Sequence, residues 1–265
     1  MEINPLTGRD LSRIAHLQPD GWMPIGPPFL FYTENKFCFP LKVEIGDTIV
    51  GIGAAIIHRK TSWLGHIIVD ASYRNQGIGT AITKKLMDLV LGKGYKTILL
   101  IATVLGAPVY KKLGFEKEGE YIFLRDGRVP DYHSHVAIPF DQRYQRTIIE
   151  MDNLISGETR TNLFEPHYNK AMLIVENNEL KAFYMPTLGE GLIEASTTNA
   201  GLELMRIKYS KDITYAAIPE QNKAGLSFLS ANGFKDYRRG IRMCYGKNIA
   251  WQPENIYGRI GGNLG

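Results

Sequence analysis

Two segments of this chain, one in each half, follow the same pattern. In both, an apolar run of strand length is followed by a polar residue, a glycine, a large side chain and a Gly-Phe pair at the same spacing. The matched positions are Thr103, Gly106, Tyr110, Gly114 and Phe115, and then Asn222, Gly225, Leu229, Gly233 and Phe234. Chance similarity of two short helices is the alternative, but shared spacing and context favour an internal duplication.

The hydrophobic pattern predicts the same kind of unit twice. In the first half we expect strands at residues 37–45, 48–58, 62–69, 97–101 and 115–124, and helices at 11–17, 79–91 and 108–113. In the second half we expect helices at 148–154, 200–209 and 223–231, and strands at 171–177, 179–185, 213–218 and after Phe234. The glycines and prolines of residues 21–28 predict a break in structure.

These elements indicate an α/β fold of the α+β kind. We expect two tandem domains, each with a mixed, largely antiparallel sheet flanked by helices. The polar segment 125–146 contains two prolines and an Asp-Gly pair, which are typical of a linker. We therefore predict one domain at residues 1–142 and a second at 143–265.

Composition narrows the class of protein. Among 265 residues, 44% are hydrophobic and 22% are charged, an ordinary globular balance. No apolar run of about 18 residues appears, so we expect no membrane span. The formal charge of +4 comes from scattered residues, and nucleic-acid binding would need a denser basic face. With two cysteines, Cys38 and Cys244, neither a disulfide framework nor a cysteine-rich zinc site is indicated, and we expect a cytoplasmic protein.

The most informative stretch is residues 67–80, with the sequence IIVDASYRNQGIGT. An apolar strand passes through a polar turn with Gly77 and Gly79 into a helix, so consecutive backbone N–H groups can face one anion, and a diphosphate suits this place. Ile82 stands where a dinucleotide motif needs its third glycine, and no Gly-Lys-Ser/Thr follows to make a P-loop. Residues 51–53 (GIG) lie inside a predicted strand, so we interpret them as a bulge or close backbone approach.

Residues 74–79, RNQGIG, resemble the Arg/Gln-x-x-Gly-x-Gly/Ala acyl-CoA signature of the GNAT acetyltransferase superfamily. Residues 106–115, GAPVYKKLGF, resemble the Ala-x-x-x-Tyr-x-x-x-Gly-Phe segment that follows it in that family. The resemblance implies acetyl-CoA as cosubstrate, with the strand pairing to the pantetheine arm and the helix N-terminus binding the pyrophosphate. The cofactor contacts it implies are Ile67, Ile68, Val69, Arg74, Asn75, Gln76, Gly77, Ile78, Gly79, Thr80 and Thr103. Family members typically have asparagine at the position of Thr103.

The resemblance also gives Tyr110 the role of proton donor to the departing thiolate. Acyl transfer from a thioester passes through an oxyanion and expels a thiolate, so a placed acid and backbone N–H donors near Ile68 and Val69 both lower the barrier. The alternative is that Tyr110 is a half-buried helix aromatic.

The general base is less well marked. Relatives that place a base on this strand have it at the positions of Gly65 and Trp63, and neither residue accepts a proton. Glu44 is nearby in sequence and is our candidate, with a water chain as the alternative. Strand alternation is expected to place His66 on the face opposite Gly65 and Ile67, where a structural histidine is the preferred interpretation.

The second half has no glycine turn of this kind, and Leu229 replaces the tyrosine. It resembles the degenerate C-terminal domain of tandem bacterial GNAT proteins. We therefore expect an N-acetyltransferase that uses its first half to acetylate a primary amine of a small molecule, with a peptide or protein lysine as the alternative substrate. A non-catalytic acyl-CoA-binding or regulatory protein is the second hypothesis. His133 and His135 share one strand face but lack a third ligand, so we expect no metal site.

Overall fold

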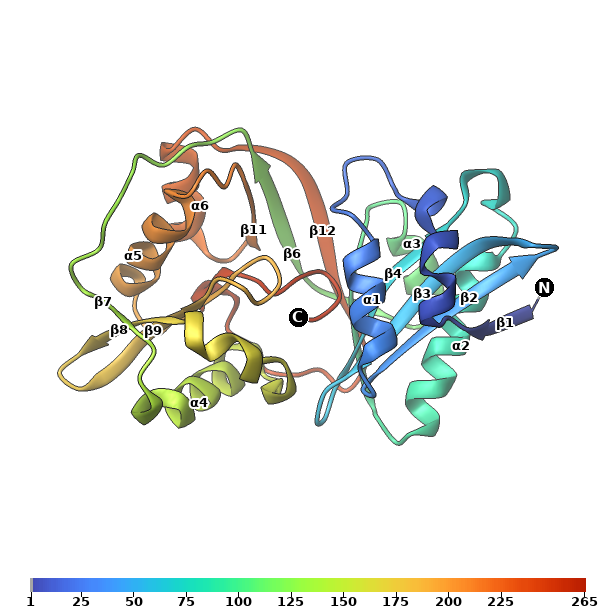
Figure 1. Ribbon diagram of the computed structural model, residues 1–265, viewed down its shortest axis with the longest axis horizontal. Coiled ribbons are helices and arrows are strands. Elements are labelled where there is room, and N and C mark those ends of the chain that lie inside the picture. Colours follow the sequence, from blue (N-terminus) through green and yellow to red (C-terminus); the bar gives the residue numbers. More distant parts are fainter. Residues whose placement is uncertain (1) are drawn as a thin grey trace.

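The first half forms one lobe of the computed structural model, which describes residues 2–265 (Figure 1). Its strands are β1 (Glu2–Pro5), β2 (Cys38–Ile45), β3 (Thr48–Ile57), β4 (Ser62–Val69), β5 (Thr97–Ala102) and β6 (Glu116–Arg125). Its helices are α1 (Gly26–Glu34), α2 (Ile78–Gly92) and α3 (Ala107–Lys112), with short 3₁₀ helices at Gly8–Arg13, Ala15–Leu17 and Ala71–Tyr73. The predicted strands and the helices at 79–91 and 108–113 are confirmed.

The second half repeats this element order. Its strands are β7 (Ala137–Pro139), β8 (Met172–Glu176), β9 (Glu179–Met185), β10 (Leu192–Ala195), β11 (Tyr215–Pro219), β12 (Lys235–Gly246) and β13 (Ile256–Gly258). Its helices are α4 (Gln145–Ser156), α5 (Thr198–Tyr209) and α6 (Lys223–Ala231), with 3₁₀ helices at Gln142–Tyr144, Thr161–Leu163, Glu165–Lys170 and Pro253–Asn255. In each half a helix precedes a three-stranded meander, and strands then alternate with two helices, which agrees with a duplication.

Helix α1 corrects one prediction. The glycine- and proline-rich segment was expected to interrupt structure, yet a helix begins within it at Gly26, with Pro27 and Pro28 in its first turn. Proline is tolerated there, because the first helical N–H groups have no partner inside the helix in any case. The helix then buries Phe29 and Tyr32 against the sheet.

The two halves exchange strands, which the sequence did not predict. The order of the larger sheet is β1-β2-β3-β4-β5-β12-β6-β11, so each of β6 and β12 lies among strands of the other half. Of the described strand pairs in this sheet, β4 with β5 is the parallel one and the others are antiparallel. The smaller sheet, β13-β10-β9-β8-β7, is antiparallel. The mixed, largely antiparallel architecture is thus confirmed, with the two lobes joined by shared strands (Figure 1).

Helix α2 covers the first sheet with an apolar stripe. Its buried side chains recur every four residues, at Ile78, Ile82, Leu86 and Val90, and each such burial stabilises the fold by roughly 1.5–3 kcal/mol. A Cβ at Gly51 would lie 2.9 Å from Ile78 Cγ2, and one at Gly53 would lie 2.7 Å from Ile82 Cγ2. The interpretation of these glycines as a close approach is therefore confirmed.

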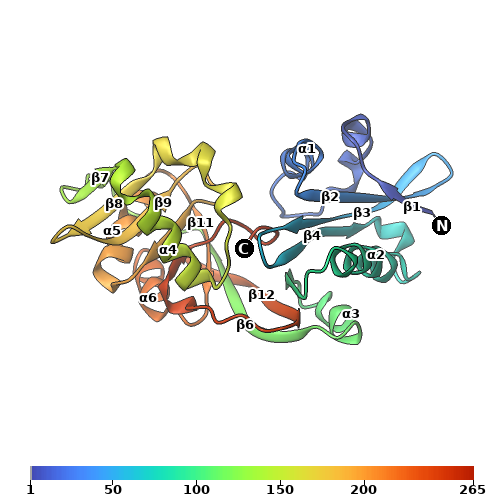
Figure 2. The same ribbon diagram turned by 90° about the horizontal axis from the view of Figure 1, so that it is seen from below.

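The C-terminal segment, residues 259–265, returns to the space between the lobes (Figure 2). Leu264 packs against core residues of both halves, and the His58 imidazole lies 3.3 Å from the Leu264 carbonyl oxygen. Among residues 2–265, no helix is both long and apolar enough to cross a bilayer.

Candidate active site

Strand β4 separates from β5 after two residue pairs. The parallel pairing joins Ser62 to Ile98 and Trp63 to Leu99, whereas β4 stays paired with β3 as far as Val69. Beyond Trp63, therefore, β4 has no strand partner on its β5 side within residues 2–265. Such an edge presents unpaired N–H and C=O groups, and an extended ligand with amide groups can pair with it. The predicted pantetheine contacts lie along this free edge.

The strand bulges where the free edge begins. His66 and Ile67 together stand opposite Gly53 of β3, and His66 has a φ of 51°, in the left-handed region that non-glycine residues rarely adopt. The predicted alternation is wrong for Gly65 and confirmed for Ile67. Gly65 packs against Asn263, and His66 is linked to Asn263 through Tyr32 on that same side. Ile67 lies on the face opposite His66 and packs with the buried residues of helix α2.

The loop after β4 turns sharply into α2. Gly77 precedes the helix with a φ of 80°, and Asn75 has a φ of 62°. In the described part of the chain, no side chain caps the helix at Gly77, and residues 74–77 are exposed. Because the first helical turn leaves its N–H groups without partners inside the helix, this end offers several donors and the positive end of the helix dipole to an anion.

The two glycines of this turn leave open space. A Cβ at Gly77 would meet no atom within 4 Å, and one at Gly79 would make only an ordinary contact, 3.6 Å from Val69 Cγ2. Packing within the protein therefore does not explain Gly79, whereas a diphosphate approaching the backbone does. Arg74 is exposed and donates its Nε to the Val69 carbonyl at 3.2 Å, and Thr80 is half-buried at the same end of the helix. The residues present fit the diphosphate of acetyl-CoA.

Helix α3 carries Tyr110, the predicted acid. Tyr110 packs on the same apolar cluster as Ile67 and Val69, with its ring 5.9 Å from that of Phe115. Burial raises the pKa of Tyr110 to about 12, so the phenol keeps its proton at neutral pH. Thr103 is exposed, and its Oγ1 accepts the Gly106 N–H at 3.1 Å. Tyr110, Ile67 and Val69 thus pack against one apolar cluster.

Glu44 lies apart from this group. Its carboxylate accepts hydrogen bonds from Lys42 and Arg13, which lower its pKa. It is on the face of β2 that packs toward the N-terminal 3₁₀ helix, whereas its neighbour Val43 is on the face shared with Tyr110. An ion-paired carboxylate of lowered pKa is a poor proton acceptor, so the geometry does not favour Glu44 as the base.

A different carboxylate, which sequence reasoning missed, lies beside β4. Glu158 of the second half is buried and accepts the Trp63 indole N–H, at 3.0 Å and 3.1 Å from its two oxygens, and the Thr61 hydroxyl. Its separation from Trp63 along the chain left no signal in the sequence. The second half therefore contributes charge to the same face of β4 that carries Gly65.

The residues of this candidate site lie within a segment that resembles a known protein family. The model of the Acetyltransferase (GNAT) family matches residues 10–115, a range that contains both β4 and α2 with its glycine turn, and also Tyr110. Residues 10–115 are a GNAT-family domain.

Characterised proteins resemble the GNAT domain at low identity. Human N-acetyltransferase 8 is 25% identical over 113 residues, 39% of this chain and 49% of that protein. N-acetyltransferase family 8 member 3 of Rattus norvegicus is 26% identical over 105 residues, 36% of this chain and 46% of that protein. The chain thus spans about half the length of these mammalian relatives. Glucosamine 6-phosphate N-acetyltransferase of Trypanosoma brucei brucei is 26% identical over 114 residues, 43% of this chain and 74% of that protein.

One solved structure matches the whole chain, second half included. A Pyrococcus horikoshii protein provisionally described as an acetyltransferase superposes with a TM-score of 0.86 at 21% identity, covering 100% of this chain and 95% of that one. This likeness shows the fold. Together, the comparisons support acetyl transfer as the general class of reaction for the GNAT domain.

The region of the second half that corresponds to the GNAT site is closed by the chain itself. Strand β10 is the counterpart of β4, since each is the last strand of its meander. Strand β13 pairs with β10, along the edge that corresponds to the free edge of β4. Helix α5 is capped by the Thr197 side chain, which accepts the Ala200 N–H, and a Cβ at Gly201 would lie 2.4 Å from the Tyr257 ring. Leu229, in the place of Tyr110, is fully buried.

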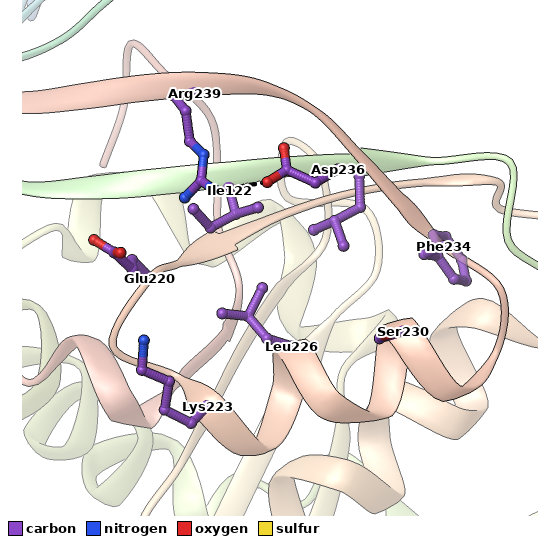
Figure 3. Close-up of a pocket in the computed structure, with 9 residues that line it drawn as sticks. Ile122, Glu220, Lys223, Leu226, Ser230, Phe234, Asp236 and Arg239 are labelled. Carbon is purple, nitrogen blue, oxygen red and sulfur yellow. Dashed lines mark hydrogen bonds and ion pairs between the residues drawn. The ribbon is translucent and has the colours of Figure 1, made fainter.

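A pocket of about 300 Å³ lies elsewhere, on the second half beside α6 (Figure 3). Its apolar part is formed by Ile122, Leu124, Leu226 and Phe234. Its polar part contains the ion pair of Arg239 with Asp236, at 2.7 Å, and the side chains of Glu220 and Lys223. None of its nine lining residues was a predicted site residue.

The histidines and cysteines considered in the sequence analysis lie outside this candidate site. His133 and His135 are exposed in the segment before β7, and within residues 2–265 no three His, Cys, Asp or Glu side chains gather as metal ligands would. Cys38 and Cys244 are buried free thiols, and burial raises the pKa of each to about 12. Neither has the character of a nucleophile.

Proposed function

We propose that this chain is an acetyl-CoA-dependent N-acetyltransferase whose GNAT domain transfers an acetyl group to a primary amine by direct attack in a ternary complex. The observation that carries the proposal is the continuity of the free β4 edge with the uncapped, glycine-flanked N-terminus of α2. The edge offers amide pairing to an extended arm and the helix offers N–H groups to a diphosphate. Acetyl-CoA has both parts in that order.

In the proposed mechanism, the chain contributes binding, polarisation and one proton. Backbone N–H groups of the edge near Ile68 and Val69 hold the acyl oxygen as negative charge develops on it. The amine nitrogen bonds to the acyl carbon, the carbon–sulfur bond breaks, and Tyr110 gives its hydroxyl proton to the leaving thiolate. The nitrogen loses one proton to solvent, and the Tyr110 phenolate is reprotonated from water.

We propose that residues 1–142 carry the reaction and that residues 143–265 act as a supporting domain that shapes the acceptor side. The 3₁₀ helix Gln142–Tyr144 spans the proposed boundary. One support is β13, which pairs with β10 along the edge that corresponds to the free edge of β4. The other is the contact of Glu158 and Asn263 with β4 of the first half. In this proposal the amine approaches the face of β4 that carries Gly65. Residues 259–265 lie against that face, so a small amine fits the proposal better than a protein lysine.

A second candidate function is non-catalytic acyl-CoA binding. It is favoured by one observation, namely that Gly65 and Trp63 provide no proton acceptor on β4. Release of free thiol from acetyl-CoA, followed with a thiol reagent across a panel of small primary amines, separates the two. The enzyme proposal requires amine-dependent release above the hydrolysis seen without amine. Saturable acetyl-CoA binding with no amine-dependent release across the panel would favour the binding protein.

A further inference from the structure

A chain of hydrogen bonds links the C-terminal segment to the bulge of β4. Asn263 lies directly over Gly65, where an added Cβ would come within 2.3 Å of the Asn263 Cβ. Its Nδ2 donates to the Tyr32 hydroxyl oxygen, and that oxygen lies 2.8 Å from Nδ1 of His66. Three residues from distant parts of the chain thus meet at the start of the free edge.

The hydrogen bonds of this chain favour one His66 tautomer. The Tyr32 oxygen accepts from Asn263, and the Tyr32 hydroxyl hydrogen is satisfied if it is donated to Nδ1 of His66, which then acts as the acceptor. An imidazole that accepts at Nδ1 carries its hydrogen at Nε2. Nε2 has no hydrogen-bond partner within residues 2–265.

The surroundings of His66 favour an uncharged ring. Trp22, Phe29 and Tyr32 place their ring centroids 6.1, 5.9 and 5.8 Å from the imidazole. Burial among these rings lowers the pKa of His66 to about 4. A ring of this kind is a weak proton acceptor at neutral pH, but its N–H can donate to a developing oxyanion without changing its charge.

We propose that His66 presents its Nε2–H to the acyl oxygen at the β4 bulge, and that Tyr32 and Asn263 are positioning residues that fix this tautomer. The inference rests on the proposed function and adds to it an oxyanion donor on a side chain. It also gives the second half a part in the site, since Asn263 comes from the C-terminal segment. No proton leaves His66 in this role.

The first test is nitrogen-15 NMR of the histidine-labelled full chain at neutral pH, which needs no turnover. We expect a protonated, pyrrole-type Nε2 and a pyridine-type Nδ1 for His66, assigned by comparison with a His66→Gln variant. Asn263→Asp is a near-isosteric change that should reverse the His66 tautomer. The new carboxylate accepts the Tyr32 hydrogen, and the Tyr32 oxygen then accepts a hydrogen bond from Nδ1–H of His66. A pyridine-type Nε2 in the wild type would overturn the assignment.

Kinetics test the catalytic part. His66→Ala and Asn263→Asp should lower kcat by roughly 10²–10³, the loss seen when one oxyanion donor is removed, with KM for acetyl-CoA unchanged. His66→Gln should recover part of kcat, because its amide can present an N–H in a similar place. Thermal unfolding and acetyl-CoA binding show whether each variant is folded.

Two outcomes would reject the donor role. One is equal loss in His66→Gln and His66→Ala, and the other is an unchanged kcat in Asn263→Asp whose tautomer has reversed. If no amine is acetylated, the donor role falls with the proposed function, while the NMR result still decides the tautomer.

Discussion

Thr103 and Asn222 perform the same structural task in the two halves. Thr103 Oγ1 accepts the Gly106 N–H at 3.1 Å, and Asn222 Oδ1 accepts the Gly225 N–H at 2.8 Å. Asn222 also donates its Nδ2 to the Ile256 carbonyl at 2.8 Å. Both halves have this hydrogen bond, but in the second half the same side chain also holds β13 in the gap that is open in the first.

This difference predicts unequal effects of truncating the two side chains. Asn222→Ala loses a cap and leaves the buried Ile256 carbonyl without its donor, which should lower the free energy of unfolding by about 2–4 kcal/mol. Thr103→Ala, at an exposed site, should cost about 0.5–1 kcal/mol. Urea unfolding of both variants measures this. Equal losses would mean that Asn222 does no more than cap its helix.

Tyr110→Phe should lower kcat by about 10²–10⁴, the usual contribution of a placed acid or base, while acetyl-CoA affinity stays the same. Tyr245→Phe is a matched control, since the Tyr245 ring also packs against Phe115, at 5.7 Å between centroids. Steady-state kinetics and calorimetry of both variants give the comparison. If Tyr110→Phe retained full kcat, Tyr110 would be a packing residue only.

Asp10 should make stability depend on pH in the acid range. Burial alone would raise its pKa, but hydrogen bonds from Lys42 and from the N–H and hydroxyl of Thr7 lower it from 3.8 to about 2. Because the pKa is lower in the folded state, the ionised carboxylate stabilises the fold above pH 3.8, and this contribution is lost as the pH falls through about 2.

The measurement is the difference in the free energy of unfolding between the wild type and Asp10→Asn. It should be largest above pH 4 and shrink toward pH 2. Asp88→Asn, which removes an exposed carboxylate on α2, makes the same change of charge and should not reproduce this profile. A difference for Asp10→Asn that is constant from pH 2 to 5 would refute the assignment.

Gly65→Ala should displace the C-terminal segment. The new methyl group would come within 2.3 Å of the Asn263 Cβ, and overpacking of this kind costs about 1–3 kcal/mol. Limited proteolysis should then cut residues 259–265 faster than in the wild type. Gly92→Ala has open space at the end of α2 and should stabilise by about 0.4–1 kcal/mol. Wild-type proteolysis in Gly65→Ala would contradict the contact.

Local patterns in the sequence predicted most helices and strands of this fold, because each of these elements depends on residues that are close together in the sequence. The periodicity of α2, the left-handed Gly77 and the repeated Gly-Phe pairs each require particular residues at fixed offsets. Strands β10 and β13 are short, which left too few residues for a pattern. The exchange of β6 and β12 was also beyond prediction, because either strand has the same apolar pattern whichever sheet it joins.

The candidate site was predictable where it lies within one continuous segment. The glycine turn and Tyr110 were recognised from spacing, and the structure places Tyr110 on the same apolar cluster as β4. The bulge at His66 was not, because strand alternation assumes one residue opposite another. Tyr32, Glu158 and Asn263 come from distant parts of the chain, and their approach to β4 depends on packing between the halves.

The central claim is a single acetyl-CoA site at the glycine turn of α2. Isothermal titration calorimetry of the full chain with acetyl-CoA tests it most directly, alongside Gly77→Glu and Gly94→Glu. Both glycines have a left-handed φ, 80° and 88°, with open space around them, so the two variants carry the same strain and charge at opposite ends of α2. We predict one site per chain, lost in Gly77→Glu and kept in Gly94→Glu. No binding by the wild type, or undiminished binding in Gly77→Glu, would contradict the account.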